Sequence, residues 1–320
     1  MDPPIHILAS GNRTVKSHCL GTVTTMTSNV KVAGRSSLLT WKDILPWQRD
    51  NEFILIGYRR ASFSYLSSLE SIISIHNETA NIWSHLLGAI FFAYTLYRYF
   101  ELGTDTKDVR AQDNVILGIY NLSVAICFLL SAAFHTFSDH SPEMHRRGNE
   151  LDHLGIVLVM WGTGISGTHF TFYCDERVRD TYFSILSGAA LSCAIFTLRP
   201  EFRKPAYRLT RFTMYCLLGA SLFAPVLHGL SRFGRAELEA GMGLTSFLSL
   251  ALVNFTGAAV YAARVPERWF PGSFDLLGQS HNWMHALVLT GALVRLRGLL
   301  EVIARWQLYT AQRGLCLGEY

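Results

Sequence analysis

The composition of the chain argues against a soluble protein. It has 320 residues, of which half are hydrophobic and only 16% are charged, and its formal net charge is +4. About a quarter of the residues of a soluble globular domain are charged, so this chain is unusually apolar. The small net charge is spread along the sequence. No glycine-rich phosphate loop or nucleic-acid-binding motif is present, so nucleic acid is not an expected partner.

Seven apolar runs follow one another along the chain, and each is long enough to cross about 30 Å of hydrocarbon as a helix. In chain order they span residues 82–100, 115–137, 151–173, 182–198, 212–230, 238–262 and 276–294. Short connectors rich in Pro, Gly and charge separate them, as is typical of loops outside the membrane. The sequence therefore predicts an all-α integral membrane protein, a multi-pass bundle of seven transmembrane helices. Whether it lies in the plasma membrane or an internal membrane stays open.

Basic residues are concentrated in the amino-terminal tail and in every second connector. The positive-inside rule then predicts a cytoplasmic amino end, and an odd number of spans makes the carboxyl end extracytoplasmic. We expect four parts along the chain. They are a disordered, Ser/Thr-rich cytosolic tail (1–37), an amphipathic juxtamembrane segment (38–80), the helix bundle (81–295) and an extracytoplasmic tail (296–320). For 38–80, an ordinary packed cytosolic helix and loop is the alternative.

Two histidines stand four residues apart in "QSHNWMHALVL", within an apolar run. Residues four apart share one face of a helix, so His281 and His285 point the same way near the start of the seventh run. His135 ends the second run and Asp152 begins the third. In a bundle whose helices alternate in direction, all four groups lie at the cytoplasmic ends of their helices. The sequence therefore predicts that three imidazoles and one carboxylate meet in one leaflet.

Such a cluster is costly inside a membrane unless its members are paired or bind an ion. Three imidazoles with an oxygen donor suit Zn²⁺, whose charge lowers the pKa of a bound water to about 7. Asp152 could bind the metal or hold that water as a general base. Ser131 lies one turn before His135 and could orient a ligand or a substrate carbonyl. The alternative for each histidine alone is a packing or hydrogen-bonding role.

The remaining polar residues near the runs have simpler expected roles. His85 is expected to be a helix-packing contact, with a substitute metal ligand as the alternative, and Glu78 and Asn81 are expected to cap the first helix. His169 and His228 lie toward the other leaflet. Arg295 and Arg297 shorten the last run or extend to the membrane interface. Cys174 and Cys316 would face the same side and could pair, although spacing alone does not fix connectivity.

Several segments of the chain together resemble the progestin and adipoQ receptor family, which includes adiponectin receptors and haemolysin III-related proteins. They are "NEFILIGYR", "HNETANIWSHLLG", "SAAFH", "LDHLGI" and "PERWFPGSFDLLGQSHNWMH", within residues 45–295. The resemblance implies seven helices around a zinc ion, with the amino end inside. It also implies that His135, His281 and His285 bind the zinc, that Asp152 holds a water, and that Ser131 belongs to the same site.

Three functions follow as alternatives. The resemblance to adiponectin receptors implies a zinc-dependent hydrolase acting on a ceramide-like lipid amide, surrounded by membrane lipids. The second alternative is a receptor or sensor in which the zinc is structural and an unknown extracellular ligand binds. A transporter, or a membrane-embedded cyclase or isomerase, is less favoured, because a transport path needs polar groups through the other leaflet as well.

Overall fold

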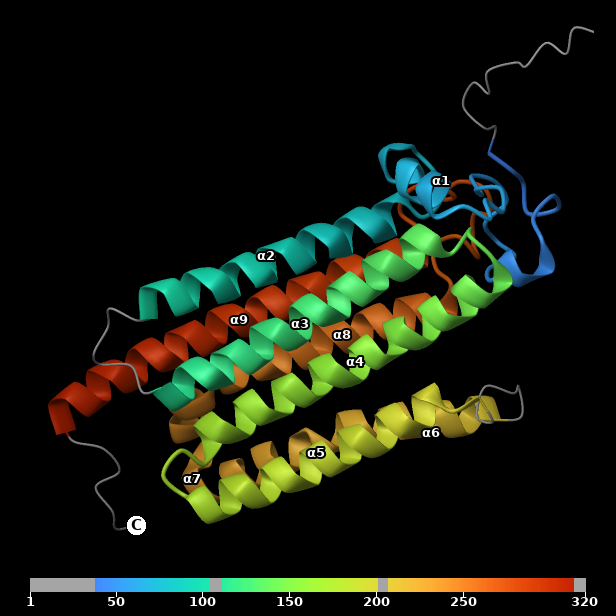
Figure 1. Ribbon diagram of the computed structural model, residues 1–320. Coiled ribbons are helices and arrows are strands. Elements are labelled where there is room, and N and C mark those ends of the chain that lie inside the picture. The colour runs from blue at the N-terminus through green and yellow to red at the C-terminus, as the bar shows by residue number, and fades with distance from the viewer. Residues whose placement is uncertain (1–37, 104–110, 201–206, 314–320) are drawn as a thin grey trace, which may run out of the picture. The chain divides into compact units, whose positions relative to one another are not determined.

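A computed structural model describes residues 38–103, 111–200 and 207–313 of the chain (Figure 1). Helices account for most of these residues, and the only β-type pairing among them is one isolated bridge between Leu39 and Tyr58. The long helices are α2 (Thr79–Gly103), α3 (Ala111–Phe137), α4 (Pro142–Thr171), α5 (Glu176–Leu198), α6 (Arg208–Ser221), α7 (Phe223–Met242), α8 (Leu244–Ala263) and α9 (Ser280–Arg313). Before them come η1 (Pro46–Gln48), α1 (Tyr65–Glu70) and η2 (Ser71–Ile73). The all-α class predicted from the sequence is confirmed for the described residues.

Four helical segments are long and apolar enough to cross a membrane. They are Gln112–Phe137, Glu176–Leu198, Thr213–Met242 and Leu244–Ala263. Helices α2, α4 and α9 fall outside this set; α4 begins with several charged residues, and α9 carries arginines in its second half.

The fifth and sixth predicted runs are divided differently in the structure. Helix α6 ends at Ser221, four residues before Pro225, because a proline lacks an N–H and its ring clashes with the carbonyl four residues earlier. Gly234, with φ of 79°, then interrupts α7. The chain turns at Gly243, where φ is 68°, and α8 begins at Leu244. The sixth run therefore begins at 244 and not at 238.

Glycines let α4 lie very close to α3. A Cβ atom added at Gly155 would lie 2.9 Å from the Cα of Cys127, and one at Gly162 would lie 2.1 Å from the Oγ of Ser123. Association of helices inside a membrane depends on such close backbone approach, since lipid gives no hydrophobic driving force between them. The second half of α4, including every residue from Gly162 to Thr171, is buried among the other helices.

Helix α9 continues past the predicted end of the last run, as far as Arg313. Arg295 is completely buried; its Nη1 donates to the carbonyl of Met242 at 2.8 Å, and its guanidinium lies 5.7 Å from the centre of the Phe247 ring. This arginine therefore neither ends the helix nor extends to the interface. It caps the carboxyl end of α7, where the unpaired carbonyls of a helix favour a cation.

Candidate metal centre

Three histidines from two helices converge at one end of the bundle. His135 is on the last turns of α3, and His281 and His285 are on the first turns of α9. The ring centroids are 4.9 Å apart for His135 and His281, 4.8 Å for His135 and His285, and 4.9 Å for the α9 pair. One ring nitrogen from each lies within 4.8 Å of the others. Two nitrogens on a tetrahedral Zn²⁺ are separated by about 3.4 Å. The ring nitrogens would therefore have to move closer together by about 1 Å to bind one Zn²⁺.

The hydrogen bonding of the histidines fits a metal. The Nδ1 of His135 lies 2.6 Å from Oε2 of Glu78, whereas its Nε2 is buried without a hydrogen-bond partner. A carboxylate accepts a hydrogen bond from Nδ1–H, and this leaves the Nε2 lone pair for a ligand. Nδ1 of His285 is also buried without a partner. Buried polar atoms almost always have partners, and a carboxylate on the far nitrogen of a histidine is the usual arrangement at a metal.

The segment that enters α2 holds Glu78 in place. The backbone N–H of His76 donates to Oγ1 of Thr79 at 2.8 Å, and the N–H of Glu78 donates to Nδ1 of His76 at 3.1 Å. Burial lowers the pKa of His76 to about 4, so its ring is neutral at pH 7 and can accept that bond. The turn thus directs the Glu78 carboxylate toward α3.

A chain of amides connects this carboxylate to α9. Nδ2 of Asn81 donates to Oε2 of Glu78 at 2.8 Å, and Nδ2 of Asn282 donates to Oδ1 of Asn81 at 2.7 Å. Oδ1 of Asn282 accepts from the N–H of Gly278 at 2.9 Å. Glu78, Asn81 and Asn282 therefore hold the His135 ring and the start of α9 in one hydrogen-bonded network.

Arg59, from the "GYR" segment, fixes the end of α3. Its guanidinium donates to the carbonyls of Thr136 at 2.8 Å and His135 at 2.5 Å, and it forms a buried ion pair with Asp139 at 3.3 Å. Burial lowers the pKa of Arg59 from its usual value, and the Asp139 carboxylate opposes this effect. The last carbonyls of a helix favour a cation, so Arg59 stabilises the turn that carries His135.

The loop before α9 is anchored by two buried carboxylates. Glu267 accepts from the N–H of Ser280 at 2.7 Å and from its hydroxyl, and so caps the first turn of α9. Asp275 accepts from the backbone N–H groups of Leu55 at 3.1 Å and Ile56 at 2.8 Å. These two acids therefore hold the segment 266–285 in place and so help to position His281 and His285 on the bundle.

The other predicted site residues lie nearby but outside the set of three. Asp152 is the eleventh residue of α4 and is half-buried. It lies close enough for its charge to act on His135 and His281, but it is not among the groups whose ligand atoms lie within 4.8 Å. Ser131 is buried one turn before His135. The sequence did not single out Tyr261 of α8, whose ring lies 4.8 Å from that of His281.

The remaining histidines follow the simpler expectations. The ring of His85 stacks between those of His285 and Phe128, at centroid distances of 3.8 Å and 4.5 Å, and both of its ring nitrogens are buried without a hydrogen-bond partner. His169 pairs with Asp113 at 2.8 Å and His228 with Tyr182 at 3.1 Å, outside the cluster. Cys174 is disulfide-bonded, and its expected partner Cys316 lies outside the described residues.

The contact of Glu78 with His135 was not expected, because the sequence predicted Glu78 to be a helix cap. Glu78 and His85 are seven residues apart, as are Phe128 and His135. Because a seven-residue step returns to the same helix face, antiparallel helices that pair His85 with Phe128 also bring Glu78 to His135. The structure has both contacts.

Comparison with known proteins identifies the family. The model of the family described as haemolysin-III related matches residues 73–296, which is most of the chain. The chain belongs to the haemolysin-III related family. Among relatives, an adiponectin receptor protein of Drosophila melanogaster is 34% identical over 263 residues, covering 82% of this chain. The chain spans only 59% of the length of that fly protein.

Two further relatives are matched over most of their own length. The ADIPOR-like receptor IZH2 of Saccharomyces cerevisiae is 32% identical over 82% of this chain and 83% of the relative. Heptahelical transmembrane protein 1 of Arabidopsis thaliana is 32% identical over 82% of this chain and 80% of the relative. This haemolysin-III related protein is therefore an integral, multi-pass membrane protein, and the family resemblance read from its motifs is confirmed.

Proposed function

We propose that the chain crosses the membrane seven times, with its amino end cytoplasmic and its histidine cluster at the cytoplasmic side. Helices α2, α3, α4, α5, the pair α6 and α7, α8 and α9 are the seven spans. The pair α6 and α7 is counted as one span because one apolar segment, Thr213–Met242, covers both, and the word heptahelical in the name of a relative supports the count of seven. The distribution of basic residues supports the orientation.

In this proposal His135, His281 and His285 hold a zinc ion. The observation that carries it is the convergence of three imidazoles while the buried Nε2 of His135 has no partner and its Nδ1 meets a carboxylate. When bound, Zn²⁺ would polarise a substrate carbonyl and acidify a water. Three histidines leave a fourth position for that chemistry, as in catalytic zinc sites.

The reaction we propose is hydrolysis of a ceramide-like lipid amide. Asp152 takes a proton from the attacking water and returns it to the leaving amine, as a general base and then a general acid. The hydroxyl of Ser131 donates to the carbonyl oxygen as negative charge develops there. Glu78 holds the His135 ring in the tautomer that leaves Nε2 deprotonated. The apolar interior of the bundle excludes bulk water from the acyl chain.

The test uses the full chain purified in detergent. Zinc per chain is measured, and release of fatty acid from a panel of lipid amides is followed for the natural protein and for Asp152→Asn and His281→Ala. We expect one zinc in the natural protein and in Asp152→Asn, with turnover in the natural protein alone. Natural rates of hydrolysis by Asp152→Asn would eliminate the role given to that carboxylate.

A second candidate is a receptor in which the zinc is structural. It is favoured by the position of Asp152 outside the three-histidine set and by the receptor names of two relatives. In that case zinc would only tie α3 to α9. Chelation would then lower the melting temperature, and no amide in the panel would be cleaved by the zinc-loaded protein.

A further inference from the structure

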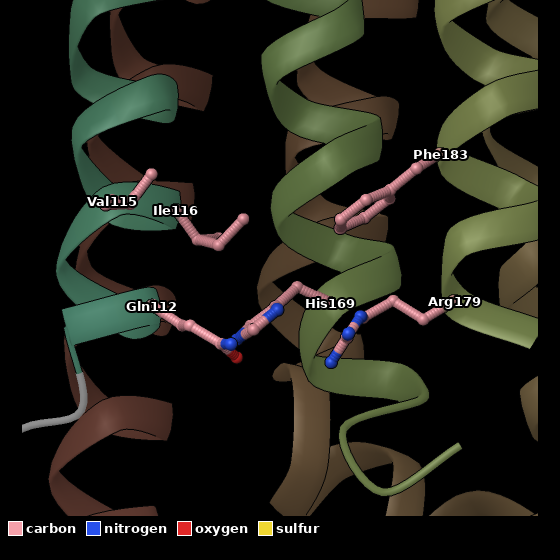
Figure 2. A pocket seen from close by; sticks show the side chains of 6 residues that line it. All are labelled: Gln112, Val115, Ile116, His169, Arg179 and Phe183. Atoms are coloured by element: carbon pink, nitrogen blue, oxygen red, sulfur yellow. The ribbon is translucent and has the colours of Figure 1, made fainter. Parts of the chain in front are cut away.

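A second polar site lies at the end of the bundle opposite the histidines. A cavity of about 330 Å³ opens between α3 and α5, over the carboxyl end of α4 (Figure 2). We call it the outer groove, and it is lined by Gln112, Val115, Ile116, His169, Arg179 and Phe183. Helix α4 packs against both α3 and α5 and forms the floor. None of the residues that line it belongs to the proposed zinc centre.

The lining of the outer groove is divided into a polar and an apolar level. Gln112 is the second residue of α3 and Arg179 the fourth of α5, so both lie where their helices begin. Figure 2 shows Gln112, His169 and Arg179 at one level, with their polar ends directed toward one another. Val115, Ile116 and Phe183 lie about one turn further along the helices, toward the middle of the bundle. A groove that is polar at the membrane boundary and apolar deeper in matches an amphiphile that lies along the helices.

The polar level is built by fixed contacts. Asp113 is buried; its Oδ1 lies 2.8 Å from Nε2 of His169, and its Oδ2 accepts from the hydroxyl of Tyr173 at 3.0 Å. The imidazole therefore contacts one oxygen of the carboxylate and the phenol donates to the other, and these two contacts fix the position of His169 in the outer groove.

Arg179 lines the groove and also contacts two exposed carboxylates outside its lining. It is 9% exposed, and its guanidinium contacts Asp180 at 3.2 Å and Glu176 at 3.9 Å, whose side chains are 66% and 75% exposed. A guanidinium has five N–H donors, more than these two contacts use. The lining of the groove therefore includes a cation and a carboxamide, and two exposed carboxylates outside the lining contact that cation. We call these two carboxylates the rim.

We propose that the outer groove binds a zwitterionic phospholipid. Its phosphate accepts hydrogen bonds from Arg179 and Gln112, because arginine matches phosphate in charge and geometry. Its ammonium group lies at the rim beside Glu176 and Asp180, and an acyl chain follows Val115, Ile116 and Phe183 into the bundle surface. In this proposal the occupant comes from the surrounding leaflet. This proposal goes beyond the zinc chemistry and does not depend on it.

The test is native mass spectrometry of the delipidated full chain, titrated with palmitoyl-oleoyl phosphatidylcholine or with the matching phosphatidylglycerol, which has no ammonium group. We expect phosphatidylcholine to bind more tightly than phosphatidylglycerol. Arg179→Gln should weaken phosphatidylcholine binding about tenfold, as loss of a charge-assisted hydrogen bond does. Arg177→Gln, at an exposed neighbour on the same helix, is the matched control and should change binding less than twofold.

Two further variants keep the result decisive if Arg179→Gln unfolds. Gln112→Leu removes the second phosphate donor without touching an ion pair and should also weaken phosphatidylcholine binding. Glu176→Gln combined with Asp180→Asn should abolish the preference for phosphatidylcholine over phosphatidylglycerol. Natural phosphatidylcholine affinity in folded Arg179→Gln or in Gln112→Leu would overturn the phosphate site. Equal binding of the two lipids by the natural chain would overturn the role of the rim.

Discussion

Replacing Glu78 tests whether a carboxylate orients the first histidine of the metal centre. Its Oε2 lies 2.6 Å from Nδ1 of His135, and the same oxygen accepts from Asn81 at 2.8 Å. Glu78→Gln keeps an oxygen acceptor for Nδ1–H but removes the negative charge. Glu78→Ala removes both, so the ring can rotate and either nitrogen can carry the proton.

The expected loss can be estimated from such contacts in general. Removing the partner of a metal-binding histidine lowers metal affinity by about 10- to 100-fold, and each factor of ten corresponds to about 1.4 kcal/mol. We expect a loss of about tenfold for Glu78→Gln, which keeps the tautomer. We expect about 100-fold for Glu78→Ala, which also leaves the amide of Asn81 without its acceptor.

The assay is competition for zinc between the purified chain and a chromophoric chelator at pH 7. Glu143→Gln is the matched control, because Glu143 is a surface carboxylate whose partners are Arg146 and Arg147. The control should bind zinc like the natural chain. If Glu78→Ala also binds zinc with natural affinity, the carboxylate does not orient His135, and our explanation of its unpaired Nε2 is wrong.

Three other predictions concern the fold that supports the site. Gly162→Ala should lower the free energy of unfolding by about 1–3 kcal/mol, because the added Cβ would lie 2.1 Å from Oγ of Ser123. Gly188→Ala, whose added Cβ would have nothing within 4 Å, should not lower it. Equal melting temperatures for the two variants in detergent would contradict the close packing of α3 and α4. Arg59→Met should cost about 3–5 kcal/mol, because it leaves Asp139 buried without its cation; thermal unfolding measures this, and restoration by Asp139→Asn in the same chain is expected. Burial lowers the pKa of His76 from 6.5 to about 4, so the folded state favours the neutral ring. Its contribution to stability is full above pH 6.5 and is lost as the pH falls toward 4. His76→Gln should therefore make the melting temperature depend less on pH between 6.5 and 4. An unchanged pH dependence in that variant would contradict a neutral His76.

Helix direction made the histidine cluster predictable from the sequence. His135 ends one apolar run and the α9 pair begins another, so alternating helices bring the three rings to one end, as the structure has them. The resemblance to the family pointed to the same residues. Neither argument required side-chain geometry, because an imidazole cluster needs only that helix ends coincide.

Contacts that depend on rotation about a helix axis were harder to predict. Glu78 precedes α2 and looked like a cap, since a carboxylate at a helix start is favourable in any context. Its bond to His135 follows only once α2 and α3 are paired in the register that also stacks His85 on Phe128. The seven-residue spacing of Glu78 and His85, and of Phe128 and His135, would have predicted this contact once the two helices were paired.

Local backbone effects account for the remaining differences. Pro225 follows the break between α6 and α7 in the fifth predicted run, and Gly243 moves the start of the sixth predicted run to 244. Arg295 was expected near the interface because a charged side chain is costly in lipid. It is buried instead because the carboxyl end of α7 presents carbonyls that accept its N–H groups. The hydropathy pattern of a sequence does not predict where a helix ends inside a bundle.

The most direct test of the proposed metal centre is zinc X-ray absorption on the purified, unchelated chain. We predict one zinc per chain with three imidazole nitrogens at about 2.0–2.1 Å, and loss of that signal in His281→Ala. A chain that binds no zinc, or whose zinc spectrum is unchanged by His281→Ala, would contradict the proposal that His135, His281 and His285 form a metal site.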